Sequence, residues 1–238
     1  MPLDRTLKIP LLSQNSLDTL LPFTRPEKFD RLGRSSKISW WQGSAGSFLT
    51  IENKALSALP TSLIYCSPDR VAHDSVRADL MPADVERLSA SEWIIDGQQL
   101  SIVRKLRTPF VLKVPPYMTI PHEVEDLLRA HIGEGTGLTP EGDDVLAGFL
   151  IAARALGINH SLSPSDWNTS TTTSFSSTLL NAAHEGFAIS IVEMAVRELV
   201  HSGCITTYRS ELTAIGATSG TAMLRGMELA QEYVRRAA

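Results

Sequence analysis

The sequence predicts an α+β protein in which a strand-rich, barrel-like amino-terminal region packs on a carboxy-terminal helical bundle. Residues 1–116 carry short apolar bursts that are typical of strands, whereas residues 117–238 carry apolar residues at helical spacing. The strands precede the helices and do not alternate with them, which favours an α+β fold over a doubly wound α/β fold. We expect the boundary between the two regions at Pro115 and Pro116, where the period changes.

Short apolar bursts with β-branched or aromatic residues predict the strands, and turn formers bound most of them. The bursts are residues 38–41, 47–51, 62–66, 93–95, 100–103 and 110–112. Residues 43–46 and the pair Asp96 and Gly97 predict two hairpin turns, because glycine and Asp-Gly readily adopt the positive φ values of tight turns.

The helices are predicted from apolar residues that recur every three or four positions. They cover residues 124–132, with Pro121 in the first turn, and then about 140–156, 177–201 and 219–236. The second helix is apolar on most sides, so we expect it to lie at the centre of the bundle. The Ser/Thr-rich residues 161–177 are expected to form a solvated connection.

Composition excludes several classes of protein. The 238 residues are 43% hydrophobic and 20% charged, with a net charge of -4, which gives no general attraction for nucleic acid or anionic membranes. Cys66 and Cys204 lie far apart, which gives neither a disulfide framework nor a cysteine zinc site, and both are expected to be buried. Because no signal peptide or transmembrane span is recognisable either, a cytoplasmic location is expected.

The least generic stretch is GEGTGLTPEGDD at residues 133–144. Its glycines allow a ligand to approach the backbone closely, and Thr139 followed by Pro140 is typical of an N-cap and a first helical residue. Free N–H groups at such a helix start suit a phosphate or carboxylate. The predicted ligand-binding residues are therefore Gly135, Thr136, Gly137, Thr139 and Gly142. A tight turn before a well-capped helix explains the same pattern, and this alternative stays open.

Asp143 and Asp144 are the candidate catalytic residues. Adjacent helical positions point about 100° apart, so only one carboxylate can share the ligand's direction. That carboxylate would orient the substrate or a cation such as Mg²⁺, although no set of metal ligands and no other cofactor is predicted. His184 is a conceivable general base, but a histidine at the edge of the core is the commoner outcome.

A second junction of this kind, IGATSGT, occupies residues 215–221 before the last predicted helix. Thr218 and Ser219 are candidates for an N-cap and for hydroxyl donors to a bound anion, with Gly220 beside them. This signal is weak by itself, because many helices begin with such residues.

Together the two motifs resemble the AllH-like proteins, a prokaryotic family linked to one subunit of oxamate carbamoyltransferase. The matching patterns are GxGLTPxGDDxLAG at 135–148 and GATSG at 216–220, with further similarity at 179–186. The resemblance covers the carboxy-terminal half, and the strand-rich half only in general layout. It implies a complex that moves a carbamoyl group between phosphate and the nitrogen of oxamate, with FdrA-like and AllG-like subunits. Ala222 is a departure, because the family often carries an aspartate there.

Two functions follow as hypotheses. In the first, the chain is a carbamoyltransferase subunit that binds a small anionic or phosphorylated metabolite, such as carbamoyl phosphate, at its glycine-rich helix starts. In the second, it is a non-catalytic accessory or ligand-binding subunit of a metabolic enzyme complex. Ala222 in place of the family's aspartate favours the second slightly.

Overall fold

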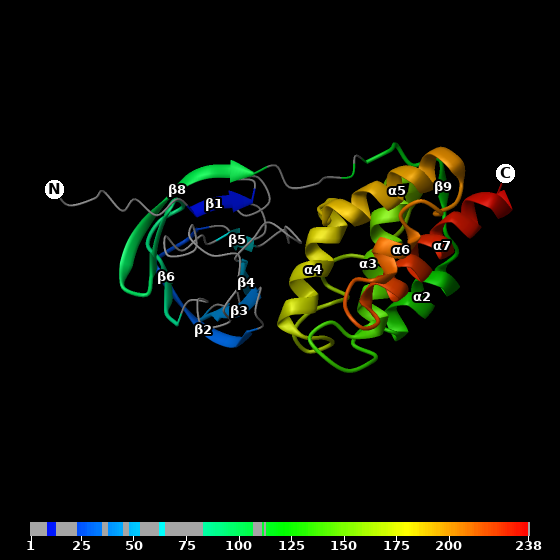
Figure 1. Cartoon of the computed structure of the whole chain (residues 1–238). Helices are drawn as coiled ribbons and strands as arrows, with labels where there is room; N and C mark the ends of the chain where they lie inside the picture. Colours follow the sequence, from blue (N-terminus) through cyan, green and yellow to red (C-terminus); the bar gives the residue numbers. More distant parts are fainter. Residues whose placement is uncertain are drawn as a thin grey trace. The chain divides into compact units, whose positions relative to one another are not determined.

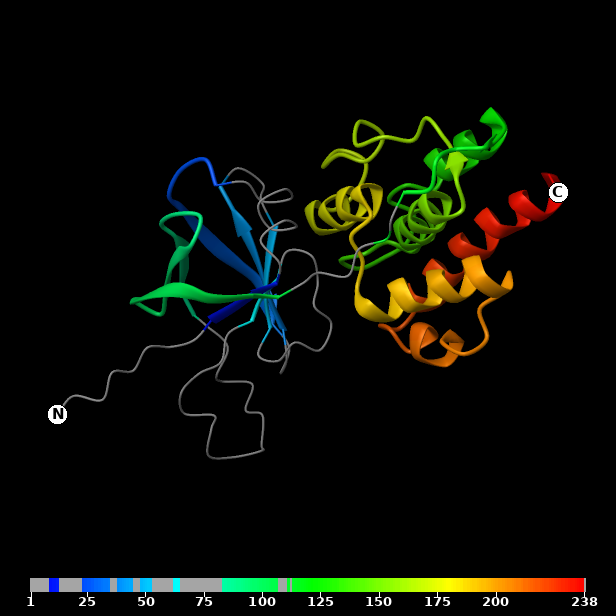
Figure 2. The ribbon, with the colours of Figure 1, turned by 90° about the horizontal axis from the view of Figure 1, so that it is seen from above.

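The computed structural model describes residues 9–12, 23–34, 38–44, 48–52, 62–64, 83–106, 111 and 113–237. The chain divides into two compact units, Met1–Thr108 and Pro109–Ala238. The first contains strands and the second mainly helices, as Figure 1 and the turned view in Figure 2 show. The predicted α+β class is therefore confirmed.

The described strands of the first unit close into a barrel in the order β1-β5-β4-β3-β2-β6-β7-β8. The pairs β1–β8 and β4–β5 are parallel, and the other neighbours are antiparallel. Closure of the sheet leaves no unpaired edge. The strands are β1 (Ile9–Leu12), β2 (Glu27–Arg34), β3 (Ile38–Gly43), β4 (Phe48–Glu52), β5 (Ser62–Ile64), β6 (Val85–Arg87), β7 (Glu92–Ile95) and β8 (Gln98–Leu106).

Most of the predicted strands and one complete turn are found in this barrel. The hairpin between β7 and β8 turns at Asp96 and Gly97, whose φ values of 51° and 75° are those that the sequence predicts. The antiparallel pair β3–β4 confirms the other hairpin, although residues 45 and 46 of its turn and residue 47 of the following burst lie outside the described residues. Residues 65, 66, 110 and 112 of the predicted bursts lie outside them too. The prediction of a strand at 110–112 is wrong for Val111, which contributes to the core of the second unit.

The second unit contains six described helices and one short pair of parallel strands, β9 and β10. The predicted helices at 124–132, 140–156 and 219–236 correspond to α2, α3 and α7. The elements are β9 (Met118–Thr119), α2 (His122–Ala130), α3 (Glu141–Ala155), β10 (Ile158–Asn159), α4 (Ser174–Glu185), α5 (Ser190–Ser202), α6 (Arg209–Thr213) and α7 (Ser219–Ala237).

The prediction of one helix over residues 177–201 is wrong, because Gly186 separates α4 from α5. Gly186 ends α4 in the left-handed conformation, with φ 95°, a common helix terminator. A Cβ atom at this position would lie 2.4 Å from Nε of Arg154 and 2.8 Å from the carbonyl oxygen of Val111. The glycine therefore both ends the helix and leaves room for the chain at Val111.

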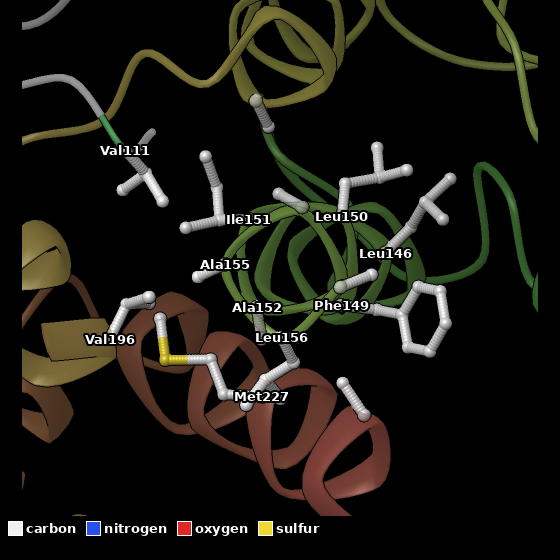
Figure 3. Close-up of a cluster of buried hydrophobic side chains, with 14 of the residues drawn as sticks. Val111, Leu146, Phe149, Leu150, Ile151, Ala152, Ala155, Leu156, Val196 and Met227 are labelled. Carbon is white, nitrogen blue, oxygen red and sulfur yellow. The ribbon is translucent and has the colours of Figure 1, made fainter. Parts of the chain in front are cut away.

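Helix α3 forms the centre of the second unit, as its apolar composition predicts. It contacts α4, α5 and α7, and Figure 3 shows its side chains among those of Val111, Val196 and Met227. A Cβ atom at Gly148 would lie 2.0 Å from the carbonyl oxygen of Met223, and one at Gly226 would lie 1.9 Å from that of Val145. Helices α3 and α7 therefore pack backbone against backbone.

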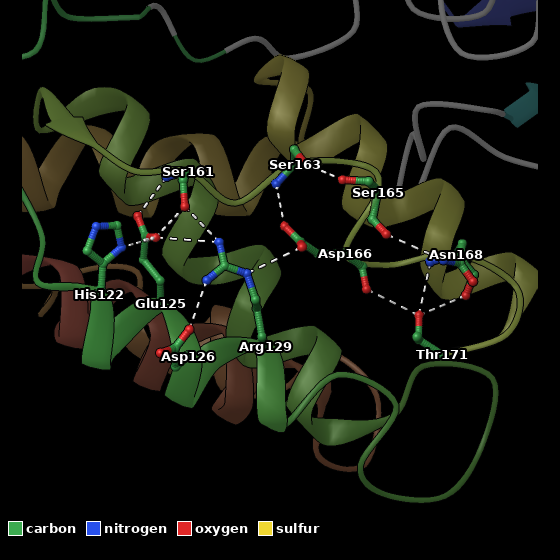
Figure 4. Close-up of polar contacts among 10 residues, drawn as sticks. All are labelled: His122, Glu125, Asp126, Arg129, Ser161, Ser163, Ser165, Asp166, Asn168 and Thr171. Atoms are coloured by element: carbon green, nitrogen blue, oxygen red, sulfur yellow. Dashed lines mark hydrogen bonds and ion pairs between the residues drawn. The ribbon is translucent and has the colours of Figure 1, made fainter.

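The Ser/Thr-rich segment leads into α4 as expected, and most of its residues are exposed or half-buried, but it is also anchored to the unit. Trp167 is fully buried, and its indole N–H donates to Oδ1 of Asn181 at 2.8 Å. Arg129 of α2 donates to Oγ of Ser161 at 2.7 Å and to Oδ1 of Asp166 at 3.3 Å, and Figure 4 shows this network. The backbone N–H of Ser161 donates to the buried Glu125 at 2.6 Å. Hydrogen bonds to α2 therefore fix the segment in place.

Candidate functional site

The structure brings the two glycine motifs together. One precedes α3 and the other precedes α7, and these two helices contact each other. Across the junction, Oγ1 of Thr139 lies 3.1 Å from Oγ of Ser219. Residues 135–138 and 216–218 are exposed, whereas Gly142 and Gly220 are buried. In each motif, the exposed residues therefore directly precede the residue whose hydroxyl makes this contact.

Backbone donors are available in the first loop. Within the described part of the chain, the N–H groups of residues 135–139 have no hydrogen-bond partner. Gly135 and Gly137 have φ values of 117° and 100°, which other residues rarely adopt. A Cβ atom at Gly135 would lie 2.7 Å from the backbone nitrogen of Glu141, whereas Gly137 has open space around it. The tight turn explains both glycines, and it leaves a row of free donors at a helix start.

Thr139 is not the N-cap that the sequence predicts. Pro140 takes that position with extended backbone, ψ 144°, and no side chain caps the helix. The helix begins one residue later than expected, at Glu141, and the hydroxyl of Thr139 is directed to Ser219 instead. Thr218 directly precedes α7, and its carbonyl oxygen accepts the N–H of Ala222 at 3.0 Å.

Asp143 is buried, with 1% of its surface exposed, and both carboxylate oxygens are occupied. Oδ1 accepts the N–H of Gly133 at 2.8 Å. Oδ2 accepts the hydroxyls of Thr172 and of Ser176, the latter at 2.6 Å. This carboxylate therefore joins the start of the glycine loop to α4 and to the segment before it. Neither hydroxyl partner was identified from the sequence, where both belong to a Ser/Thr-rich stretch without a distinguishing pattern.

Asp144 is also buried, with 4% of its surface exposed, but its surroundings differ. Its Oδ2 atom has no hydrogen-bond partner among the described residues. Burial raises the pKa of this carboxyl to about 6, and the negative charges of Asp143 and Glu141 add to the effect. The hydroxyls of Ser219 and Thr139 lower the pKa only in part. Asp144 is thus the carboxyl that lies beside the contact between the two motifs.

A pocket of about 570 Å³ lies on another side of the glycine loop, between α2, α3 and α7. Its lining includes Leu127, Leu128, Val145 and Leu229, together with the ion pair of Glu141 and Arg225, whose atoms are 2.6 Å apart. None of the three residues Thr139, Asp144 and Ser219 lines it.

The structure also shows the positions of two other residues that the sequence singled out, His184 and Cys204. His184 packs against Trp167 and His160 with ring centroids 5.9 and 6.2 Å apart, and burial lowers its pKa. This is the position at the edge of the core that the sequence favoured. Cys204 is exposed, so its expected burial is wrong, and Cys66 lies outside the described residues.

The described residues contain no group of three or more His, Cys, Asp or Glu side chains that could hold a metal ion. In the same residues, no helix has the length and apolar character needed to cross a bilayer.

Comparison with known proteins matches the helical unit to a family. Residues 131–231 match the family model of the oxamate carbamoyltransferase subunit AllH. The match runs from the glycine loop into α7 and confirms the resemblance predicted from the two motifs. No curated protein and no solved structure matches the chain. The match covers part of the second unit and none of the first.

Proposed function

We propose that this chain is a catalytic subunit that transfers a carbamoyl group between phosphate and the nitrogen of oxamate. The observation that carries the proposal is Asp144, a buried carboxyl with a free oxygen and a pKa of about 6, beside two glycine-rich helix starts. The family match supplies the reaction class.

The phosphate would be held by the glycine loop. The free N–H groups of residues 135–139 present hydrogen-bond donors and the start of α3 adds a partial positive charge, which suit an anion. The N–H of Gly142 is not one of these donors, because it donates to the carbonyl oxygen of Glu134 at 3.0 Å. Because one of the hydroxyls of Thr139 and Ser219 donates to the other, only the second of them, with Thr218 next to it, would add a neutral donor. As the bond to phosphate breaks, negative charge grows on the leaving oxygen, and fixed donors stabilise that charge.

Asp144 would accept a proton. The nitrogen of oxamate attacks the carbonyl carbon of carbamoyl phosphate, forming a C–N bond. The C–O bond to phosphate breaks, and phosphate leaves with the electron pair. The proton lost from the nitrogen passes to the carboxylate of Asp144. A pKa of about 6 suits this step, because the group is mostly ionised near pH 7 yet more basic than an ordinary aspartate.

The test measures phosphate release that depends on both carbamoyl phosphate and oxamate. The full chain is co-expressed with FdrA-like and AllG-like subunits, which the resemblance implies as partners. We expect Asp144→Asn to lower kcat by at least roughly 100-fold and to change KM for carbamoyl phosphate only slightly. Asp126→Asn is the matched control, because its side chain is 74% exposed on α2. A variant Asp144→Asn with full turnover would remove this residue from the mechanism.

The accessory role is the second candidate, and Ala222 favours it. This residue is 1% exposed on α7, so the position at which the family often carries an aspartate is a buried methyl group here. An accessory subunit predicts that the complex stays active when Asp144 is replaced. It also predicts that the isolated chain binds neither phosphate nor carbamoyl phosphate in calorimetric titration.

A further inference from the structure

Asp143 connects three segments that meet beside the proposed phosphate site. Its carboxylate accepts the N–H of Gly133 from the glycine loop, the hydroxyl of Thr172 from the Ser/Thr-rich segment and the hydroxyl of Ser176 from α4. All three partners donate, so they suit a carboxylate better than an amide.

Further contacts join the same loop and segment. The hydroxyl of Thr173 donates to the carbonyl oxygen of Leu138 at 2.6 Å and accepts the N–H of Ser176 at 3.0 Å, so it caps α4 while it binds the loop. A Cβ atom at Gly133 would lie 2.1 Å from the carbonyl oxygen of Thr171, so the two backbones are in direct contact there. The loop is therefore held at both ends, at Gly133 and at Leu138. Between these two points lie Gly135, Thr136 and Gly137, whose N–H groups are free.

We propose that Asp143 is a positioning residue, which fixes the glycine loop through Gly133, Thr172 and Ser176 so that its free N–H groups are preorganised for the substrate phosphate. The proposal rests on the proposed function for the identity of the ligand, and on the hydrogen bonds for the fixed loop. Preorganised donors bind an anion without the loss of loop entropy that a mobile loop would suffer. Asp143 itself touches no reacting atom.

Asp143 also acts on its neighbour through its charge. The groups that face Asp144 are Asp143 and Glu141 on α3, Thr139 on the loop and Ser219 on α7, and Glu141 is paired with Arg225. The negative charge of Asp143 helps to raise the pKa of Asp144. Loss of this charge therefore moves the acid limb of a pH–rate profile to lower pH, which loss of a hydroxyl partner would not do.

The first experiment follows amide hydrogen exchange of Gly133, Glu134 and Gly142 in the full chain, because these N–H groups of the loop are hydrogen-bonded, to Asp143, His131 and Glu134 respectively. We expect Thr172→Val to speed exchange there, because it removes one hydroxyl that Asp143 binds. Thr178→Val is the matched control, since the hydroxyl of Thr178 donates to the carbonyl oxygen of Ser174 in its own helix, at 2.9 Å. Unchanged exchange in Thr172→Val would overturn the inference.

The second experiment titrates the same proteins with inorganic phosphate and with carbamoyl phosphate. Thr172→Val and Ser176→Ala should each weaken binding by roughly 3- to 10-fold, as expected for one lost hydrogen bond, and Thr178→Val should not. A wild-type chain that binds neither ligand would overturn the proposed function, and the exchange data would still show whether the loop is fixed.

The third experiment measures kcat against pH in the complex. Asp143→Asn should move the acid limb to lower pH, whereas Thr172→Val should leave the limb in place and raise KM for carbamoyl phosphate. An unshifted limb in Asp143→Asn would overturn the electrostatic part of the inference. If Asp143→Asn fails to fold, Thr172→Val and Ser176→Ala still decide whether the loop is positioned from α4.

Discussion

Two neighbouring aspartates of α3 differ in the hydrogen-bond partners of their carboxylate oxygens. Asp143 accepts three hydrogen bonds, so both of its carboxylate oxygens have partners. Asp144 is buried with a free Oδ2, and its raised pKa shows that the fold favours its neutral form. At neutral pH Asp144 is therefore mostly ionised, although its buried position favours the neutral form. A carboxyl with such a perturbed pKa is typical of functional sites.

The pKa of Asp144 predicts how stability depends on pH. Its folded value of about 6 lies above the ordinary value of 3.8, so the folded state binds more protons between these two pH values. Stability therefore falls as pH rises through this window, by up to about 3 kcal/mol. Asp144→Asn removes the titration. In urea denaturation of the full chain we expect the variant to exceed the wild type by about 1 to 3 kcal/mol near pH 7.5, and to lose this advantage near pH 4.

The control for this prediction is Asp126→Asn, which replaces an exposed aspartate of α2. The stability of this variant relative to the wild type should be the same near pH 7.5 and near pH 4. A variant Asp144→Asn that is less stable than the wild type at pH 7.5 by the same amount as at pH 4 would contradict the prediction.

Which aspartate faces which surroundings was not predictable from the sequence. The 100° separation predicts that only one could share the ligand's direction, and in the structure the two carboxylates have different surroundings. The choice depends on where α3 begins, and Thr139 followed by Pro140 predicts a start one residue too early. Thr172 and Ser176, which bind Asp143, belong to a segment without periodicity, so sequence spacing gave no sign of them.

At the scale of helices, the packing of α3 on α7 depends on glycines as much as on apolar side chains. Gly148 and Gly226 each face a backbone carbonyl of the other helix. Gly220 of α7 similarly faces the backbone carbonyl of Leu212 in α6. Such close packing aligns the starts of the two helices, where Thr139 meets Ser219. The glycine pattern after Asp144 is therefore explained by helix packing alone.

This packing predicts a large effect of Gly148→Ala. Alanine has the higher helix propensity, by about 1 kcal/mol, but its methyl group would lie 2.0 Å from the carbonyl oxygen of Met223, so the helices must separate. We expect a net loss of about 2 to 4 kcal/mol, measured by chemical denaturation. Arg236→Ala, at an exposed position of α7, is the control and should change stability by less than about 0.5 kcal/mol. A melting temperature of Gly148→Ala equal to that of the wild type would contradict this.

Local patterns predicted long elements well and short or polar ones poorly. Helices α2, α3 and α7 have sustained periodicity, whereas α6 has five residues and no recognisable period. Strand β2 has the sequence EKFDRLGR, and among its residues only Phe29 is buried, so alternation could not reveal it. The break at Gly186 was missed because a single glycine is tolerated in a helical pattern, and the contact with Val111 that requires it is distant in sequence.

At the scale of the whole molecule, the second compact unit, Pro109–Ala238, includes residues that precede the change of period at Pro115 and Pro116. Residues 109–116 have no helical period, yet Val111 lies in the helical core. Its N–H donates to the carbonyl oxygen of Gly186 at 2.8 Å, and its own carbonyl oxygen accepts Nε of Arg154 at 2.8 Å. Val114 donates to the carbonyl oxygen of Arg154 at 3.0 Å. This segment therefore pairs with the second unit through its backbone.

These contacts predict different stabilities for two fragments of the chain. A fragment of residues 109–238 retains the compact unit, whereas one of residues 117–238 loses Val111 and its hydrogen bonds to Gly186 and Arg154. We expect both to be helical by circular dichroism, with the shorter fragment less stable by about 2 to 4 kcal/mol. Val111→Ala in the longer fragment removes only the side-chain contacts of Val111. The stability of this variant should therefore lie between the stabilities of the two fragments. Equal melting temperatures for the two fragments would mean that residues 109–116 are dispensable, and that the second unit begins where the helical period does.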